Sequence, residues 1–138
     1  MMAAHESHPR RRGCGHRRDQ RGAAMVEFAL VLPLLVMLVF GIIEFGRGYN
    51  AKITVTAAAR EGARLLALGG TADEVRARVR ASAPSLDPSL ITFNSFTAPC
   101  TTGATVEVQA SYPVAWEIPI VGGGTWTLQG RGVMRCGG

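Results

Sequence analysis

The sequence predicts an α+β protein in which a long N-terminal transmembrane α-helix extends into a small exported head with a short helix and an antiparallel sheet of about three strands. Three observations support this prediction. An apolar run follows a basic N-terminus, a helical pattern continues from it to a pair of glycines, and the remaining chain is rich in Thr, Val, Phe and Ile. At 138 residues there is room for one such head.

The apolar run extends from Ala23 to Ile43 and is interrupted only by Glu27 and Pro33. A bilayer core of ~30 Å needs about 20 apolar residues, so this run is long enough to cross it. We expect Pro33 to kink the helix rather than end it, because backbone polar groups in lipid have no other hydrogen-bond partners. The sequence therefore predicts a transmembrane helix over residues 23–46.

The positive charge of the chain is concentrated before this run. Residues 1–22 carry six arginines against Glu6 and Asp19, so they hold +4 of the net charge of +5. A nucleic-acid-binding protein would spread its basic residues over a folded surface, whereas charge next to an apolar run sets membrane topology. We therefore expect no nucleic-acid partner and a single-pass protein of the inner or plasma membrane, with a disordered cytoplasmic leader at residues 1–22 and an extracytoplasmic C-terminal head.

Two alternatives for the N-terminal region carry less weight. A cleaved secretory signal has an apolar region of about 7 to 15 residues and a small-residue cleavage pattern, and EFGRGYN after the run offers no such pattern. A zinc site would need a supporting core and a usual ligand spacing, which the leader lacks. Its candidate ligands would be His5, His8, Cys14 and His16.

Beyond the membrane the helix is expected to continue over residues 47–70. Apolar and charged residues alternate there at helical spacing, and Gly69-Gly70 forms an expected C-terminal stop. An unbroken helix from Ala23 to Leu68 would be about 69 Å long. Its outer part would then carry the head, at residues 71–138.

The head is expected to begin with a short helix over TADEVRARVRASA. Thr71 stands at the N-cap, Glu74 at the capping-box position, and Pro84 follows as a stop. Three strands are then expected, over residues 90–97, 105–112 and 125–134.

The segment PVAWEIPIVGGG is too rich in proline and glycine for us to expect a regular element. Its Trp116 and aliphatic residues could pack on the head or lie against lipid, and the sequence leaves both open. Glycines 122–124 lack the Lys and Ser/Thr of a phosphate loop, so we interpret them as a flexible turn.

Cys100 and Cys136 both lie beyond the predicted membrane helix, whereas Cys14 precedes it. A disulfide between the two outer cysteines would close a loop of roughly 35 residues and stabilise a small domain by about 3 to 4 kcal/mol. Two free thiols in a reducing compartment are the alternative.

Enzymatic function has little support, because the residues after the membrane helix contain no histidine and no recognisable catalytic motif. An acid pair such as Asp73 with Asp87 would be the feature to look for. We expect no catalytic residue, no metal, no cofactor and no small-molecule substrate.

The stretch RGAAMVEF joins a basic leader, Gly22 and a lone carboxylate, Glu27, inside an apolar helix. A charged acid in a membrane helix costs on the order of 2.5 to 3.5 kcal/mol, so it usually has a partner or a function. RGAAMVEFALVLPLLVMLVFGIIEFGRGYNAKITVTAAAREGARLLAL resembles the N-terminal signature of the TadE-like proteins of the tight adherence (Flp) system, which resemble type IV pilins. The resemblance covers Arg21 to about Leu68 and implies a pilin-like fold.

The resemblance implies cleavage between Gly22 and Ala23 by a prepilin peptidase, which would leave Glu27, followed by Phe28, as the fifth residue of the mature chain. The α-amino group released has a pKa of about 7.7 to 8.0, so the amine of one subunit can offset the Glu27 carboxylate of a neighbour. The alternative is that Glu27 lies at the inner interface and extends toward headgroups.

A second candidate assembly surface is a helical face of small residues. It would allow another helix to approach closely, or it would make room for the chain's own sheet, and the sequence leaves both open. The face consists of Ala58, Ala59, Gly62 and Ala63.

The leading functional hypothesis is a TadE-like minor pilin or pseudopilin that acts in assembly of a Flp-type pilus or a related secretion apparatus through helix packing in the membrane. Its expected partners are the membrane, other pilin-like subunits, platform proteins of pilus assembly and a prepilin peptidase, with a surface fibre as the destination after processing. The alternative is an unprocessed, single-pass accessory protein whose exported head binds a partner.

Overall fold

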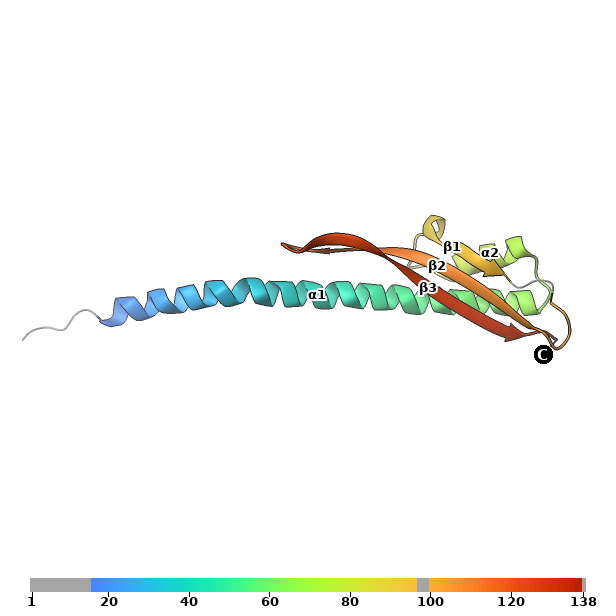
Figure 1. Cartoon of the computed structure of the whole chain (residues 1–138), viewed down its shortest axis with the longest axis horizontal. Helices are drawn as coiled ribbons and strands as arrows, with labels where there is room; N and C mark the ends of the chain where they lie inside the picture. The colour runs from blue at the N-terminus through green and yellow to red at the C-terminus, as the bar shows by residue number, and fades with distance from the viewer. Residues whose placement is uncertain (1–15, 97–99, 138) are drawn as a thin grey trace, which may run out of the picture. The chain divides into compact units, whose positions relative to one another are not determined.

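The computed structural model describes residues 16–96 and 100–137, which form two helices, one short 3-10 helix and three strands (Figure 1). The chain divides into two compact units, one up to Leu38 and one from Val39 onward, and each is described by itself. The elements are α1 (His16–Ala67), α2 (Ala72–Ala81), the 3-10 helix (Pro88–Leu90), β1 (Thr92–Phe96), β2 (Thr105–Ile118) and β3 (Gly122–Arg135).

The first unit contains the N-terminal part of α1. This helix begins at His16, so the last residues of the predicted leader are helical, and the earlier part of the leader and its candidate zinc ligands lie outside the residues whose side chains are described. Pro33 lies inside the helix without ending it, as expected. The large apolar side chains here are exposed; Phe28 is 65% and Leu34 is 70% exposed.

By length and composition, one helix among the described residues could cross a membrane. It is the part of α1 from Gly22 to Ala67, whose most apolar window has a mean hydropathy of 2.7 and no buried residue. Large apolar side chains exposed over many consecutive turns are rare on soluble proteins. The helix therefore suggests that the chain is anchored in a membrane.

The second unit begins with the rest of α1, which ends where the glycine pair predicted an end. Gly70 N–H donates to the Leu65 carbonyl and Gly69 N–H to the Leu66 carbonyl, each at 3.0 Å, and Gly69 has a φ of +90°. This is the Schellman arrangement, in which a residue without Cβ adopts the left-handed conformation.

The short helix α2 has the predicted capping box. The Glu74 backbone N–H donates to Thr71 Oγ1 at 3.4 Å, and the Thr71 N–H donates to Glu74 Oε2 at 2.8 Å. The Glu74 carboxylate accepts from the Thr71 N–H and also from the Thr71 hydroxyl, the latter at 2.9 Å, and these two hydrogen bonds hold the pKa of Glu74 below its ordinary value of 4.5. The helix ends at Ala81, three residues before Pro84.

The three strands form one antiparallel sheet in the order β1-β2-β3, which confirms the predicted fold class (Figure 1). β1 pairs with β2 from Thr92 opposite Ser111 to Phe96 opposite Val108, with an irregularity between Phe93 and Ser95. β2 and β3 pair over fourteen positions and form a long hairpin.

The expectation that residues 113–124 form no regular element is wrong. β2 continues through Pro113 to Ile118, and glycines 122–124 belong to β3 rather than to a flexible turn. Proline fits because the pairing of β2 with β1 ends at Ser111, which leaves that side of β2 open and needs no donor there.

Gly123 and Gly124 fit in β3 because atoms of Trp116 occupy the space that side chains at these two positions would need. A Cβ on Gly124 would lie 2.9 Å from the Trp116 indole nitrogen, and one on Gly123 would lie 2.8 Å from the Trp116 carbonyl oxygen. The turn itself comprises Pro119, Ile120 and Val121.

The core of the head lies between the sheet, α2 and one face of α1. A Cβ on Gly130 would lie 2.5 Å from the Val55 carbonyl oxygen, and one on Gly132 would overlap the carbonyl of Ala59. Strand β3 thus packs directly against the backbone of α1. The buried core residues on α1 are Ala51, Val55, Ala58, Ala59, Ala63 and Leu66.

Candidate functional site

The peptide bond between Gly22 and Ala23 lies inside α1, on the exposed helix of the first unit. A Cβ on Gly22 would meet nothing within 4 Å, so no tertiary contact protects this turn. Glycine is also less favourable than alanine in a helix interior, by roughly 0.8 to 1 kcal/mol. The turn at Gly22 is therefore weakly held and accessible to a partner.

Glu27 and Phe28 are exposed on the same unit, among the large apolar side chains that follow Gly22. None of the salt bridges between described side chains includes Glu27. A carboxylate on an apolar helix with such surroundings needs a partner from another molecule or from the headgroup region. The described residues bring Glu27 and Gly22 onto one helix but supply no intrachain partner.

The small-residue face lies in the second unit and is covered by the chain itself. Ala58, Ala59 and Ala63 are fully buried, and a Cβ on Gly62 would lie 2.5 Å from the Val79 side chain of α2. The intrachain alternative thus accounts for the burial of this face. A helix from another subunit could reach these residues only after the head had separated from α1.

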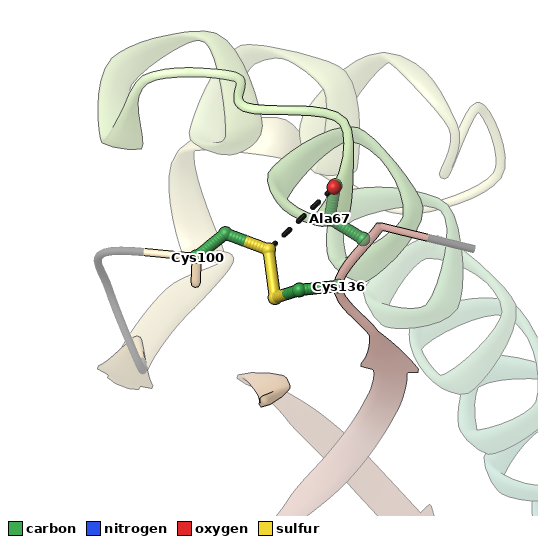
Figure 2. Close-up of a disulfide and its surroundings, with 3 residues drawn as sticks. All are labelled: Ala67, Cys100 and Cys136. Carbon is green, nitrogen blue, oxygen red and sulfur yellow. Dashed lines mark hydrogen bonds between the residues drawn. A yellow bond between two sulfur atoms is a disulfide. The ribbon is translucent and has the colours of Figure 1, made fainter. Parts of the chain in front are cut away.

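The two outer cysteines form a disulfide, with Cα atoms 5.7 Å apart and a sequence separation of 36. Figure 2 shows the disulfide beside the end of α1, where Cys100 Sγ lies 3.5 Å from the Ala67 carbonyl oxygen. A disulfide sulfur carries no proton, so in the oxidised protein this is a contact rather than a hydrogen bond. The cross-link joins the segment before β2 to the end of β3, next to the end of α1.

Sequence reasoning did not find a groove between the β2–β3 hairpin and α1 within the second unit. Its lining includes Phe40, Glu44 and Arg47 from α1 and Trp116 from β2. The Glu44 side chain is only 12% exposed and pairs with Arg47 at 3.1 Å. The one feature of the sequence that could have indicated this groove was Trp116, a large aromatic residue in a segment rich in proline and glycine.

Two polar atoms at this groove have no hydrogen-bond partner among the described residues. They are Glu44 Oε2 and Trp116 Nε1, and both are buried. Buried polar atoms without partners are uncommon and call for water or another external group. This groove is therefore the one place in the head where the described side chains leave an unsatisfied donor and an unsatisfied acceptor together.

The acids considered for catalysis have local structural contacts. Asp73 pairs with Arg76 at 2.9 Å, and Asp87 accepts hydrogen bonds from Ser89, which hold the pKa of Asp87 below its ordinary value. No group of three or more potential metal ligands occurs among the described residues. These acids cap or stabilise short helices.

Comparison with known proteins gives one match. The family model described as "TadE-like protein" matches residues 22–64, which is less than half of the chain. No curated protein and no solved structure matches. The matched segment begins at Gly22, includes Glu27 and the apolar run, and ends within the buried stretch of α1. Residues 22–64 are therefore a TadE-like segment, and the family resemblance predicted from the sequence is confirmed over this part of the chain.

Proposed function

We propose that this chain is a TadE-like minor pilin or pseudopilin that takes part in assembly of a Flp-type pilus or a related secretion apparatus. The observation that carries the proposal is the family match over residues 22–64, which covers both Gly22 and the exposed apolar helix after it. Association with pilus assembly proteins in the membrane follows from that family. The helix is then both the membrane anchor and the surface through which subunits pack.

The proposed topology places the N-terminus in the cytoplasm and the head outside the inner or plasma membrane. The arginines before the apolar run support this orientation, because basic residues stay on the cytoplasmic side. The disulfide between Cys100 and Cys136 supports it independently, since such bonds persist in oxidising compartments.

The proposed processing step is cleavage between Gly22 and Ala23 by a prepilin peptidase. Hydrolysis removes the basic leader and creates a new α-amino group four residues before Glu27. In the low dielectric of the bilayer, an isolated carboxylate is strongly disfavoured, whereas one paired with the amine of a neighbouring subunit is not. Glu27 would then select the packing register between subunits, with Phe28 beside it on the exposed helix surface.

The experiment that tests this proposal is the intact mass of the full-length protein from cells with and without a prepilin peptidase. We expect a mature chain beginning at Ala23 only where the peptidase is present. Gly22→Val should block the cleavage, whereas Gly41→Val should not, although both glycines lie on α1 with nothing within 4 Å of an added Cβ.

The role of Glu27 is tested by co-purification of two differently tagged copies after cleavage. Glu27→Gln should leave cleavage after Gly22 unchanged and weaken the association of copies, because the charge is lost while shape and polarity remain. A chain that keeps residues 1–22 in peptidase-positive cells would instead support the unprocessed accessory protein whose exported head binds a partner.

A further inference from the structure

The tip of the β2–β3 hairpin exposes apolar side chains where a hairpin in water would expose polar ones. Ile120 is 81%, Val121 is 62% and Trp126 is 52% exposed. The turn also places Ile120 at a φ of +76°, a conformation that favours glycine or asparagine over a β-branched residue. The chain thus keeps an isoleucine at the tip despite the conformational strain.

The tip lies against the part of α1 where the apolar run ends. The base of the tip, at Trp116 and Pro119, shares a groove with Phe40 and Glu44 of α1. Phe40 belongs to the last turns of the apolar run, and Glu44 is the first charged residue after Glu27. A membrane that surrounds the run must therefore have one of its two surfaces close to this groove.

The second unit also exposes large apolar side chains of α1 at the end of the apolar run. Ile42 and Ile43 on α1 are 65% and 50% exposed, so the apolar face of the helix extends to the level of the hairpin tip. Trp116 and Trp126 lie with ring centroids 5.9 Å apart at the base of the tip. Tryptophan is enriched at the membrane–water interface of membrane proteins because its ring is apolar and its N–H is polar.

The unsatisfied polar atoms of the groove fit the same surroundings. Glu44 Oε2 lacks a donor and Trp116 Nε1 lacks an acceptor, and water from a hydrated headgroup region that entered the groove would supply both. The charged side chains that line the groove are Glu44, Glu117 and Arg47, so their sum is acidic rather than basic. Contact with lipid here would therefore depend on apolar burial and would not require anionic lipid.

We propose that the tip of the β2–β3 hairpin is a second membrane contact, in which Ile120 and Val121 enter the boundary between headgroups and acyl chains and Trp116 and Trp126 lie at the interface. This inference rests on the proposed membrane anchoring by α1. Its consequence is that the head is held at a fixed height and orientation on the membrane, because it then has two attachment points.

The test uses the full-length chain carrying Trp116→Phe, which leaves Trp126 as the only tryptophan. The protein is reconstituted into phosphatidylcholine vesicles whose acyl chains are brominated close to the headgroup. Trp126 fluorescence should be quenched, and adding Ile120→Asp with Val121→Asp should reduce this quenching by about threefold or more. The matched control is Val133→Asp, an exposed valine near the other end of β3, which should leave the quenching unchanged.

Vesicle flotation separates failure of this inference from failure of the anchoring. A chain that floats with the vesicles while Trp126 escapes quenching would overturn the hairpin contact and leave the anchoring by α1 intact. Protection of Trp126 from a water-soluble quencher without quenching by brominated lipid would also overturn it, and would assign the tip to a protein partner. A chain that does not float would refute both.

Discussion

Two apolar stretches of α1 differ in the size and exposure of their side chains. In the first unit, large residues such as Phe28, Leu34 and Leu35 are more than half exposed. In the second, Ala58, Ala59 and Ala63 are fully buried under the chain's own head. Both stretches are apolar in the sequence, so hydropathy alone does not say which surface the protein covers itself. Side-chain size distinguishes the two stretches, because close packing of a sheet on a helix needs small residues.

The geometry of β3 explains this difference. Gly130 and Gly132 allow the strand backbone to contact the backbone of α1 at Val55 and Ala59. Large side chains at these positions would hold the two elements apart and leave voids between them. The exposed stretch has the opposite design, since bulky side chains bury more apolar area in lipid per turn.

The largest expected effect concerns the head that covers the buried stretch of α1. Replacing Cys100 and Cys136 together with alanine should lower the free energy of unfolding of the head by about 4 kcal/mol, because the bond closes a long loop in the unfolded chain. Denaturant unfolding of the full chain in detergent micelles, followed by tryptophan fluorescence, measures it. Membrane anchoring should not change.

Chemical reduction of the unsubstituted chain provides the control for this prediction and should reproduce the loss. An unchanged unfolding midpoint in the double variant would mean that the disulfide contributes nothing to stability.

The next largest effect concerns the exposed apolar stretch of α1. Leu35→Arg should raise the free energy of membrane insertion by about 2.5 to 3.5 kcal/mol, because it places a charge near the centre of the apolar run. The fraction of protein that resists alkaline extraction from membranes measures it. Leu68→Arg is the matched control, since this leucine is also exposed but follows the end of α1. Equal loss of anchoring in both variants would argue against a lipid-facing stretch.

A smaller effect tests the close contact between β3 and α1. Gly132→Ala should destabilise the head by about 1 to 3 kcal/mol, because the added methyl group overlaps the Ala59 backbone. Thermal or denaturant unfolding of the full chain reads this out. Gly41→Ala, which adds the same group to open space on α1, should leave the stability of the head unchanged. A tolerated Gly132→Ala would show that the strand can move away from the helix without cost.

The smallest effect concerns the cap of α2, which presents Val75 and Val79 to the buried stretch. Thr71→Ala should cost about 1 kcal/mol near neutral pH. The measurement is denaturant unfolding of the full chain in detergent micelles, compared with the unsubstituted protein.

The cap should also make stability depend on pH, because hydrogen bonds from Thr71 lower the pKa of Glu74 in the folded protein below its ordinary value of 4.5. The contribution of the ionised Glu74 is therefore fully present above the unfolded pKa and is lost as the pH falls through the lower, folded pKa. Unfolding midpoints of the unsubstituted chain and Glu74→Gln should converge over that acidic range. A difference that persists there at its neutral-pH size would contradict this assignment.

The features that the sequence predicted well depend on few neighbouring residues. The Thr71–Glu74 capping box and the stop at Gly69-Gly70 follow from backbone groups within one helical turn. The disulfide was predicted because only two cysteines lie beyond the apolar run, on the side of the membrane where disulfides persist. The strand boundaries around Pro113 were mispredicted, because a proline or glycine is tolerated or not according to what lies on the other side of the strand.

By itself, the sequence determined the apolar helix, its basic flank, the position of Glu27 after Gly22 and the TadE-like resemblance, because these are properties of consecutive residues. Only the tertiary structure decided that Ala58, Ala59 and Ala63 pack within the chain, that residues 113–124 belong to a hairpin, and that Trp116 meets Glu44 at a groove. These outcomes depend on contacts between residues far apart in the chain. The three alanines are buried because β3 approaches α1 closely. In the hairpin, Gly123 and Gly124 leave the space that Trp116 occupies.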